Sequence, residues 1–146
     1  MKNVKDILQS KADAKTYSVA PGTMVVDALR LMAEKMVGAL LILDNEKPVG
    51  IFSERDYARK FGISDLSSKT TPIEQVMTKN LICVAPTDSM EYCMELVTNK
   101  HVRHLPVVEN NQLVGMISIG DLVKNIIEDQ KAMILQLEKY MRGETY

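Results

Sequence analysis

The sequence predicts a mixed fold, α+β or α/β, in which two β-α-β-β-α units pack around a pseudo-twofold axis and an extended C-terminal helix follows. Three observations predict it. An internal duplication relates the two halves of the 146-residue chain. Within each half, short apolar runs typical of buried strands alternate with apolar residues at the three- and four-residue steps of helices. The last predicted helix is longer than its counterpart in the first half and carries an apolar seam.

The duplication is visible when the chain is shifted against itself by 65 positions, which carries Ser53 onto Ser118 and Asp56 onto Asp121. A single short motif recurs by chance easily, but a whole ungapped unit does not. We therefore expect one repeat over residues 1–66, a second over 67–128 and a helical extension over 129–146. The same shift superimposes further identical residues: Val19-Ala20-Pro21 on Val84-Ala85-Pro86, Lys35 on Lys100, Leu40 on Leu105, Asn45 on Asn110, and Val49-Gly50 on Val114-Gly115.

The first repeat begins with a helical lead-in, and its longest helix is predicted from apolar residues at helical steps, with Thr23 as the N-cap. Residues 39–43 form a continuous apolar run that is short enough for a strand buried on both faces. The expected elements are, in order, a lead-in helix at 4–9, a loop at 12–16, a strand at 17–20, a helix to Met36, strands at 39–43 and 49–52, a helix at 56–61 and a polar linker at 62–71.

The second repeat follows the same order, and either Thr87 or Asp88 is the expected N-cap of its first long helix. Its expected elements are a lead-in helix at 72–77, a strand at 81–84, a helix to about 99, strands at 105–108 and 112–117, and a last helix at 119–142. The last helix carries a heptad seam with one polar member, Gln130. One repeat is too small to cover this seam, so the helix either folds back on the module or meets a second chain. We favour a homodimer, through this helix or through the module faces. The seam consists of Ile119, Val123, Ile126, Gln130, Met133, Leu137 and Tyr140.

A Ser-x-x-Asp motif ends each apolar strand run and opens the helix that follows it, at Ser53 and Asp56 and again at Ser118 and Asp121. The first amides of a helix have no partners within it, and the helix dipole there favours negative charge. Such a junction can receive a phosphate, and the neighbouring carboxylate can accept two ribose hydroxyls. Ser-x-x-Asp is equally a capping box, which needs no ligand.

Composition argues against several classes of function. The net charge is −1 with no basic run, so there is no electrostatic signature of nucleic-acid binding. No apolar stretch approaches the roughly 18 residues of a membrane span, and the N-terminus lacks a signal sequence, so we expect a cytoplasmic protein that does not bind membranes. Cys83 and Cys93 are expected as small buried hydrophobic residues, and neither they nor the histidines have metal-ligand spacing. No nucleophile–base pair is visible. We expect neither a metal requirement nor catalysis.

These patterns together resemble a known family. The Gly-hydrophobic-x-Ser-x-x-Asp ending of both repeats and the strand Arg103-His104-Leu105-Pro106-Val107-Val108 are similar to those of cystathionine-β-synthase (CBS) domains. A pair of such domains is called a Bateman module. The resemblance covers residues 1–128 and is greatest to small stand-alone CBS-pair proteins. It implies a regulatory module that binds adenosine nucleotides between its repeats and responds by a change of shape or of partner affinity.

The resemblance also implies site residues. The motif aspartates, Asp56 and Asp121, would bind ribose hydroxyls, and the motif serines, Ser53 and Ser118, would lie beside phosphates. AMP is the leading ligand, with ADP, ATP, NAD or S-adenosylmethionine as alternatives. At the Asp121 site, further contacts would come from both repeats: Tyr17, Val37 and Gly38 from the first, and Arg103, Met116 and Gly120 from the second.

The two sites are not equivalent in sequence. Arg103-His104 has no basic counterpart in the first repeat, and Arg55 stands where the second repeat has Gly120. Arg55 could hold a phosphate bidentately or pair with Asp56 and Glu54. His104 is expected to contact phosphate or to pack at the cleft. Because glycine lets a ligand approach the backbone closely, we favour the Asp121 site for adenosine.

A second hypothesis treats the chain as a structural or dimerisation module, in which the Ser-x-x-Asp motifs are only helix caps. Ligand binding distinguishes the two hypotheses. The sequence does not identify the regulated protein or the sign of its regulation.

Overall fold

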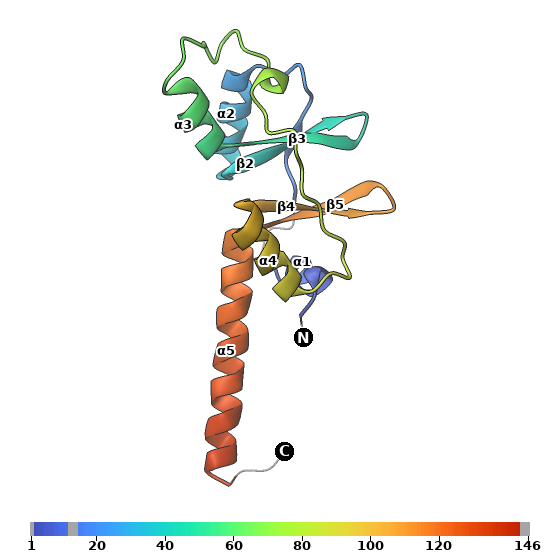
Figure 1. The fold of residues 1–146 in the computed structure, drawn as a ribbon, viewed down its shortest axis with the longest axis vertical. Helices are drawn as coiled ribbons and strands as arrows, with labels where there is room; N and C mark the ends of the chain where they lie inside the picture. Colours follow the sequence, from blue (N-terminus) through green and yellow to red (C-terminus); the bar gives the residue numbers. More distant parts are fainter. Residues whose placement is uncertain (1, 12–14, 144–146) are drawn as a thin grey trace.

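The computed structural model describes residues 2–11 and 15–143, and it confirms a mixed fold of two repeats followed by a long C-terminal helix (Figure 1). The predicted loop at 12–16 lies largely outside the described residues. The elements are α1 (Val4–Ser10), β1 (Ser18–Val19), α2 (Val25–Lys35), β2 (Ala39–Asp44), β3 (Lys47–Ser53), α3 (Glu54–Phe61), the 3-10 turn η1 (Ile73–Gln75), α4 (Met90–Lys100), β4 (His104–Glu109), β5 (Gln112–Ser118) and α5 (Ile119–Met141).

Each repeat is built on an antiparallel hairpin, β2–β3 in the first and β4–β5 in the second. The turns form because Asn45-Glu46 and Asn110-Asn111 take positive φ angles, a conformation that asparagine tolerates and that matches the twist of paired strands. The hairpin register pairs Ala39 with Ser53 and His104 with Ser118. Both motif serines therefore lie at the same end of equivalent hairpins. The two hairpins lie side by side at the centre, with α2 and α3 on one outer side and α1 and α4 on the other (Figure 1).

The first strand of each repeat is shorter than predicted. Ser18 and Val19 pair in parallel with β2, whereas the expected strand at 81–84 is reduced to one bridge between Val84 and Val107. The ladder does not continue beyond Val84, because the Ala85 amide donates to the Asp88 carboxylate at 2.7 Å and Pro86 has no amide hydrogen.

Two predicted N-caps and one predicted helix were wrong. Thr23 does not cap α2, since its carbonyl accepts the Ile73 amide and the N-cap is Met24. The cap of α4 is Ser89, whose hydroxyl accepts the Tyr92 amide at 3.0 Å. Asp88 is not available for that role because its carboxylate binds Ala85. The lead-in helix at 72–77 is only the single turn η1.

The lead-in segments pack across the duplication. Val4 and Ile7 of α1 lie in the core of the second repeat, whereas Ile73 and Val76 lie in the core of the first. The motif glycines permit this packing. A Cβ on Gly115 would lie 2.9 Å from Leu8 Cδ2, and one on Gly50 would overlap the Met77 side chain. The packed units therefore differ from the sequence repeats at their lead-in segments.

Helix α5 runs from the second repeat away from the module as one continuous helix (Figure 1). Its first turns are anchored by buried Leu122 and Asn125. The Lys2 ammonium donates to Asn125 Oδ1 at 3.0 Å and pairs with Asp129 at 3.0 Å. Beyond Gln130 the helix stands clear of its own module, so the alternative in which it folds back is not what the single chain adopts. No helix within residues 2–11 and 15–143 combines the length and the apolar character needed to cross a bilayer.

Candidate functional site

Two clefts open between the repeats, one beside each Ser-x-x-Asp motif. The Asp56 cleft has a volume of about 610 Å³, and the Asp121 cleft has about 290 Å³. Gly38 and His104 line both of them. Ligand pockets in proteins usually occupy about 300–1,000 Å³, so only the Asp56 cleft falls well within that range.

Both motifs form complete capping boxes. The Ser53 amide donates to Asp56 Oδ2 at 2.9 Å, and the Asp56 amide donates to Ser53 Oγ at 3.1 Å. Ser118 and Asp121 repeat this geometry with the same two distances. Each serine is the last residue of its strand and the N-cap of the helix that follows. Its backbone is extended, and its hydroxyl oxygen accepts the amide hydrogen of the aspartate at N3. The capping role predicted as the alternative is therefore present at both sites.

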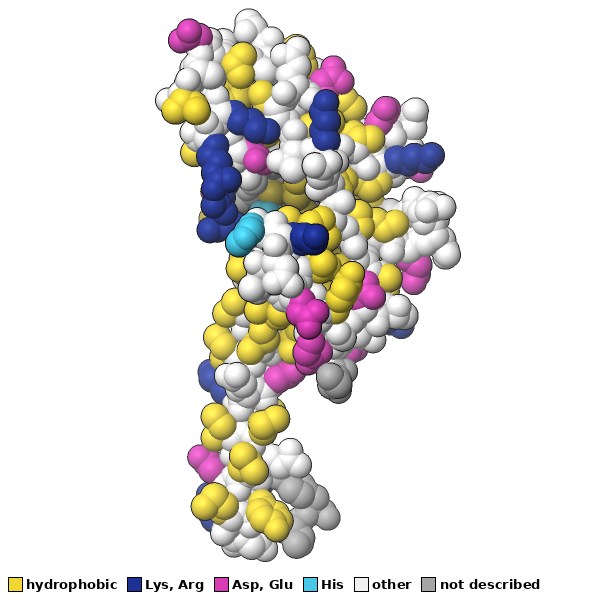
Figure 2. Space-filling model, in the orientation of Figure 1, with side chains coloured by type: hydrophobic (Ala, Val, Ile, Leu, Met, Phe, Trp, Pro, Cys, Tyr) yellow, Lys and Arg dark blue, Asp and Glu magenta, His cyan; other side chains and the backbone are white. Residues whose placement is uncertain are grey.

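The Asp56 cleft gathers basic side chains. Arg55 and Arg59 come from successive turns of α3, and Lys100 and Arg103 approach from the second repeat. Figure 2 shows Lys and Arg side chains gathered at the waist between the two halves. Repulsion from Arg59 and Arg103 lowers the pKa of Arg55, and attraction from Asp56 does not compensate for it. A group of cations that repel one another favours the binding of an anion.

The remaining oxygen of Asp56 faces the linker. Thr78 donates its hydroxyl to Asp56 Oδ1 at 3.2 Å, and Thr78 is held in place by a bridge to Ile51. The same cleft has an apolar wall, which is formed by Ile51, Leu81, Ile82, Val102 and Ile119.

In the Asp121 cleft the carboxylate has a cationic partner within the chain. The Lys11 ammonium lies 3.0 Å from Asp121 Oδ2 and donates to the Met116 carbonyl at 2.9 Å. Burial, the largest single influence, would raise the pKa of Asp121. The hydrogen bonds from Ser118 and the charge of Lys11 outweigh burial, so the pKa is lowered. Lys35 lies over the Tyr17 ring at 5.6 Å from its centroid, on the opposite wall.

His104 stands between the two clefts. Burial lowers its pKa, against the attraction of Asp121. The neutral imidazole is therefore favoured at neutral pH, and it packs at the shared wall with Gly38. A neutral ring can still donate a hydrogen bond to a phosphate oxygen.

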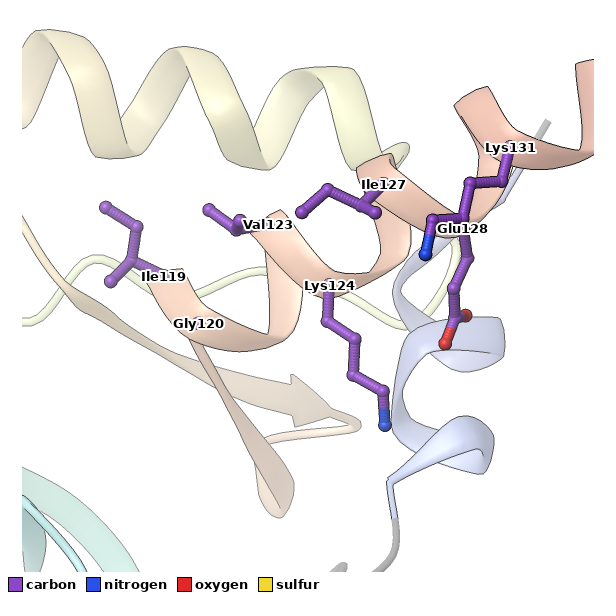
Figure 3. A pocket seen from close by; sticks show the side chains of 7 residues that line it. All are labelled: Ile119, Gly120, Val123, Lys124, Ile127, Glu128 and Lys131. Carbon is purple, nitrogen blue, oxygen red and sulfur yellow. The ribbon is translucent and has the colours of Figure 1, made fainter. Parts of the chain in front are cut away.

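The structure gathers eleven of the twelve predicted site residues into the two clefts. Arg103 lines the Asp56 cleft and not the Asp121 cleft. Gly120 lines neither; it faces an outer groove beside Ile119 and Val123, since it lies one helical step from Asp121 (Figure 3). The predicted residues at the Asp121 cleft are Tyr17, Val37, Gly38, His104, Met116, Ser118 and Asp121, and those at the Asp56 cleft are Gly38, Ser53, Arg55, Asp56, Arg103 and His104.

The cleft residues that were not predicted include Lys11, Arg59, Thr78 and Lys100. Arg59 had a signal, since it follows Arg55 by four residues on a predicted helix and so shares its face. Lys11 and Thr78 had none. They follow the lead-in segments, where the duplication has no ungapped match. Among the described residues, no cluster of His, Cys, Asp and Glu is suited to hold a metal ion.

The sequence and the structure were compared with known proteins. The sequence profile described as "CBS domain" matches twice, at residues 4–62 and 73–128. A mitochondrial CBS domain-containing protein of Arabidopsis thaliana, CBSX3, is 32% identical over 96% of this chain and 72% of its own length. A CBS-domain protein of Burkholderia ambifaria has a similar structure, with a TM-score of 0.84, 46% identity and coverage of 88% of this chain and 96% of its own. CBSX2, solved in complex with AMP, has a TM-score of 0.74 and 26% identity over 86% of this chain and 97% of its own.

Proposed function

The chain belongs to the CBS-domain family, and on that basis we propose that it is a regulatory module that binds an adenosine nucleotide, with AMP as the first ligand, in the Asp56 cleft. The observation that carries the proposal is the combination of the Asp56 carboxylate with mutually repelling cations in a cleft of about 610 Å³.

The chemistry of a nucleotide matches this combination. A ribose offers two adjacent hydroxyls, which a carboxylate such as Asp56 can accept together. A phosphate offers oxygens to guanidinium groups, which bind it bidentately. Arg55 and Arg103 approach the cleft from different repeats, so a bound phosphate would join the two halves. The apolar wall around Ile82 and Val102 suits a purine ring.

The choice of the Asp56 cleft differs from the preference drawn from the sequence, which was for the Asp121 site. That preference rested on Gly120, which lies outside the Asp121 cleft. Arg103, which was expected at the Asp121 site, lines the Asp56 cleft instead. The smaller volume and the Lys11 ion pair also weigh against a nucleotide at Asp121. The AMP complex of CBSX2 supports AMP as the first ligand to test, ahead of ADP, ATP, NAD and S-adenosylmethionine.

Regulation in this proposal follows from differential affinity. A nucleotide that binds one arrangement of the two repeats more tightly than another shifts the population toward the first. The regulated protein would read this shift as a changed surface. The competing function, a structural module without ligand, is favoured by one observation: both motifs are already complete helix caps.

Calorimetric and thermal titration with AMP, ADP, ATP, NAD, S-adenosylmethionine and adenosine tests the proposal. We expect AMP to stabilise the fold, by about 2.7 kcal/mol at a hundred times its dissociation constant, and adenosine to bind more weakly because it lacks the phosphate. If no adenosyl compound bound at millimolar concentration, the proposed nucleotide binding would be contradicted and the structural module without ligand would be favoured.

Arginine variants refine this experiment. Arg55→Ala and Arg103→Ala should each weaken AMP by about tenfold and adenosine hardly at all, because a charged hydrogen bond contributes about 1.5–3 kcal/mol and these groups are solvent-exposed. Arg30→Ala is the control: Arg30 is also helical and exposed, but it pairs with Asp27 at 3.2 Å on α2. Equal losses for AMP and adenosine would show that the arginines do not meet the phosphate.

A further inference from the structure

One short segment of each repeat forms a wall of one cleft. It runs from the last residue of the long helix, α2 or α4, to the first residue of the strand that follows. Residues 35–39 of the first repeat line the Asp121 cleft, and residues 100–104 of the second repeat line the Asp56 cleft. The shift of 65 positions carries one segment onto the other, so equivalent positions line the two clefts. We call these segments the first and second cleft loops.

The two cleft loops share their lysine and their valine and differ at the other three positions. The differing residues are Met36, Gly38 and Ala39 in the first loop and His101, Arg103 and His104 in the second. The second loop therefore carries three basic side chains where the first carries none. Figure 2 shows a histidine side chain beside the Lys and Arg side chains at the waist between the two halves.

The backbone does not require this difference. Met36 ends α2 with φ 56° and ψ 44°, and His101 ends α4 with φ 55° and ψ 37°. Glycine takes this left-handed conformation without steric cost, whereas a larger residue is strained in it. Since Met36 takes the same conformation without a polar side chain, the fold does not need a histidine at position 101. Both side chains are exposed, so packing does not select the histidine either.

The helix dipole does not account for the difference. A cation at the C-terminal end of a helix is stabilising, and Lys35 and Lys100 provide one in both repeats. His101 and Arg103 add basic groups only beside the Asp56 cleft, whose opposite repeat already contributes Arg55. Repulsion from Arg103 contributes to the lowered pKa of Arg55, which shows that the two guanidinium groups are close enough to interact. A bound anion would relieve this repulsion.

We infer that the second cleft loop selects a phosphate-bearing ligand for the Asp56 cleft and that His101 binds the phosphate beside Arg103. This inference rests on the proposed nucleotide binding and assigns its phosphate specificity to a segment outside the Ser-x-x-Asp motif. An imidazole N–H can donate to a phosphate oxygen in the neutral or the protonated form, and a guanidinium can donate two hydrogen bonds to the same phosphate. The first cleft loop offers neither group at the equivalent positions.

Glycine variants test the role of His101 without damage to the fold, because glycine relieves the positive φ at position 36 or 101. By calorimetry, we expect His101→Gly to weaken AMP about fivefold and to leave adenosine unchanged, on the scale of one hydrogen bond. Met36→Gly is the matched control and should change neither affinity. Both variants should melt at or above the wild-type temperature. His101→Arg keeps a donor at this position and should restore AMP binding.

The outcomes of this experiment separate the inference from the proposed function. If the wild type binds AMP and His101→Gly binds it equally well, or loses AMP and adenosine to the same extent, the inference is overturned and the nucleotide site stands. If the wild type binds neither compound, the proposed function fails and the inference fails with it.

A transplant tests whether the loop itself selects phosphate. Gly38→Arg is sterically permitted, because a Cβ on Gly38 would have no atom within 4 Å other than those of its chain neighbours. The background is Lys11→Met with Asp56→Asn, which removes the ammonium from Asp121 and weakens the first site. Adding Met36→His and Gly38→Arg should tighten AMP binding at the Asp121 cleft by about tenfold or more and leave adenosine unchanged. Equal AMP affinity with and without the transplanted residues would overturn the inference.

Discussion

The Asp56 and Asp121 clefts share one capping box but differ in what surrounds the carboxylate. Asp56 accepts a hydroxyl from Thr78 at 3.2 Å, within a group of arginines that repel one another. Asp121 is bound by the ammonium of Lys11 at 3.0 Å. A ribose hydroxyl can displace a neutral hydroxyl from a carboxylate more easily than it can displace an ammonium ion. The Asp56 carboxylate is therefore available to accept ribose hydroxyls, whereas Lys11 neutralises the Asp121 carboxylate.

The difference comes from the lead-in segments. Because each segment packs on the opposite repeat, Lys11 follows α1 into the second unit, while Thr78 follows η1 into the first. Both repeats keep the motif serine and aspartate, whereas Lys11 and Thr78 follow lead-in segments that have no ungapped match in the duplication. Differences between the clefts can thus arise without any change to the motifs.

The largest expected effect separates the two carboxylates. Asp56→Asn keeps a capping side chain but removes the charge that accepts ribose hydroxyls, so AMP should bind about 10- to 100-fold more weakly, on the scale of 1.5–3 kcal/mol for a charged hydrogen bond. Asp121→Asn is the matched control and should change AMP affinity less than threefold. Calorimetry measures both affinities.

Urea unfolding of the same two variants checks their caps, and each should lose less than about 1 kcal/mol. If Asp121→Asn abolished AMP binding while Asp56→Asn did not, the assignment of the clefts would be reversed. If both lost stability without a change in affinity, the aspartates would be caps alone.

A smaller effect is expected from the ion pair. Lys11→Met removes the ammonium from Asp121, so the Asp121 cleft should gain a second, weaker AMP site that is visible as a higher stoichiometry in calorimetry. Lys5→Met on the exposed face of α1 is the control. An unchanged stoichiometry would mean that Lys11 does not block the cleft.

The ion pair also predicts a pH dependence. The pKa of Asp121 is lowered below its ordinary 3.8 in the folded chain, so its contribution to stability is present above the unfolded pKa and is lost as pH falls through the folded pKa. As pH falls below about 5, the wild type should progressively lose its stability advantage over Lys11→Met, an advantage of about 1 kcal/mol or less because both groups are partly exposed.

Most of the fold could be predicted because the duplication shows the sequence pattern of most helices and strands twice, once in each repeat. The hairpin turns at Asn45 and Asn110 and the boxes at Ser53 and Ser118 depend on local interactions, which local sequence reveals. The cap of α2 could not be predicted, since the contact that excludes Thr23 comes from Ile73, which is distant in the sequence. The contact that excludes Asp88 from capping α4 is local, from the Ala85 amide, but it was not predicted. Ile126 followed the heptad pattern, but its neighbours were set by the core of the second repeat.

The smallest expected effect concerns the residue that the two clefts share. Burial lowers the pKa of His104 below its ordinary 6.5, so the unfolded chain binds a proton that the folded chain resists, and stability falls as pH drops below about 6.5. Lys11 and Arg103 add to this resistance, while Asp121 and Asp56 oppose it. Unfolding free energies at pH 7.5 and 5.5 should therefore fall more for the wild type than for His104→Gln, by less than about 1 kcal/mol. AMP bound at Asp56 would bring a phosphate toward His104, favour its protonated form and flatten the slope in the wild type alone. A slope that AMP leaves unchanged would place the phosphate away from the shared wall, toward Arg55 and Arg59.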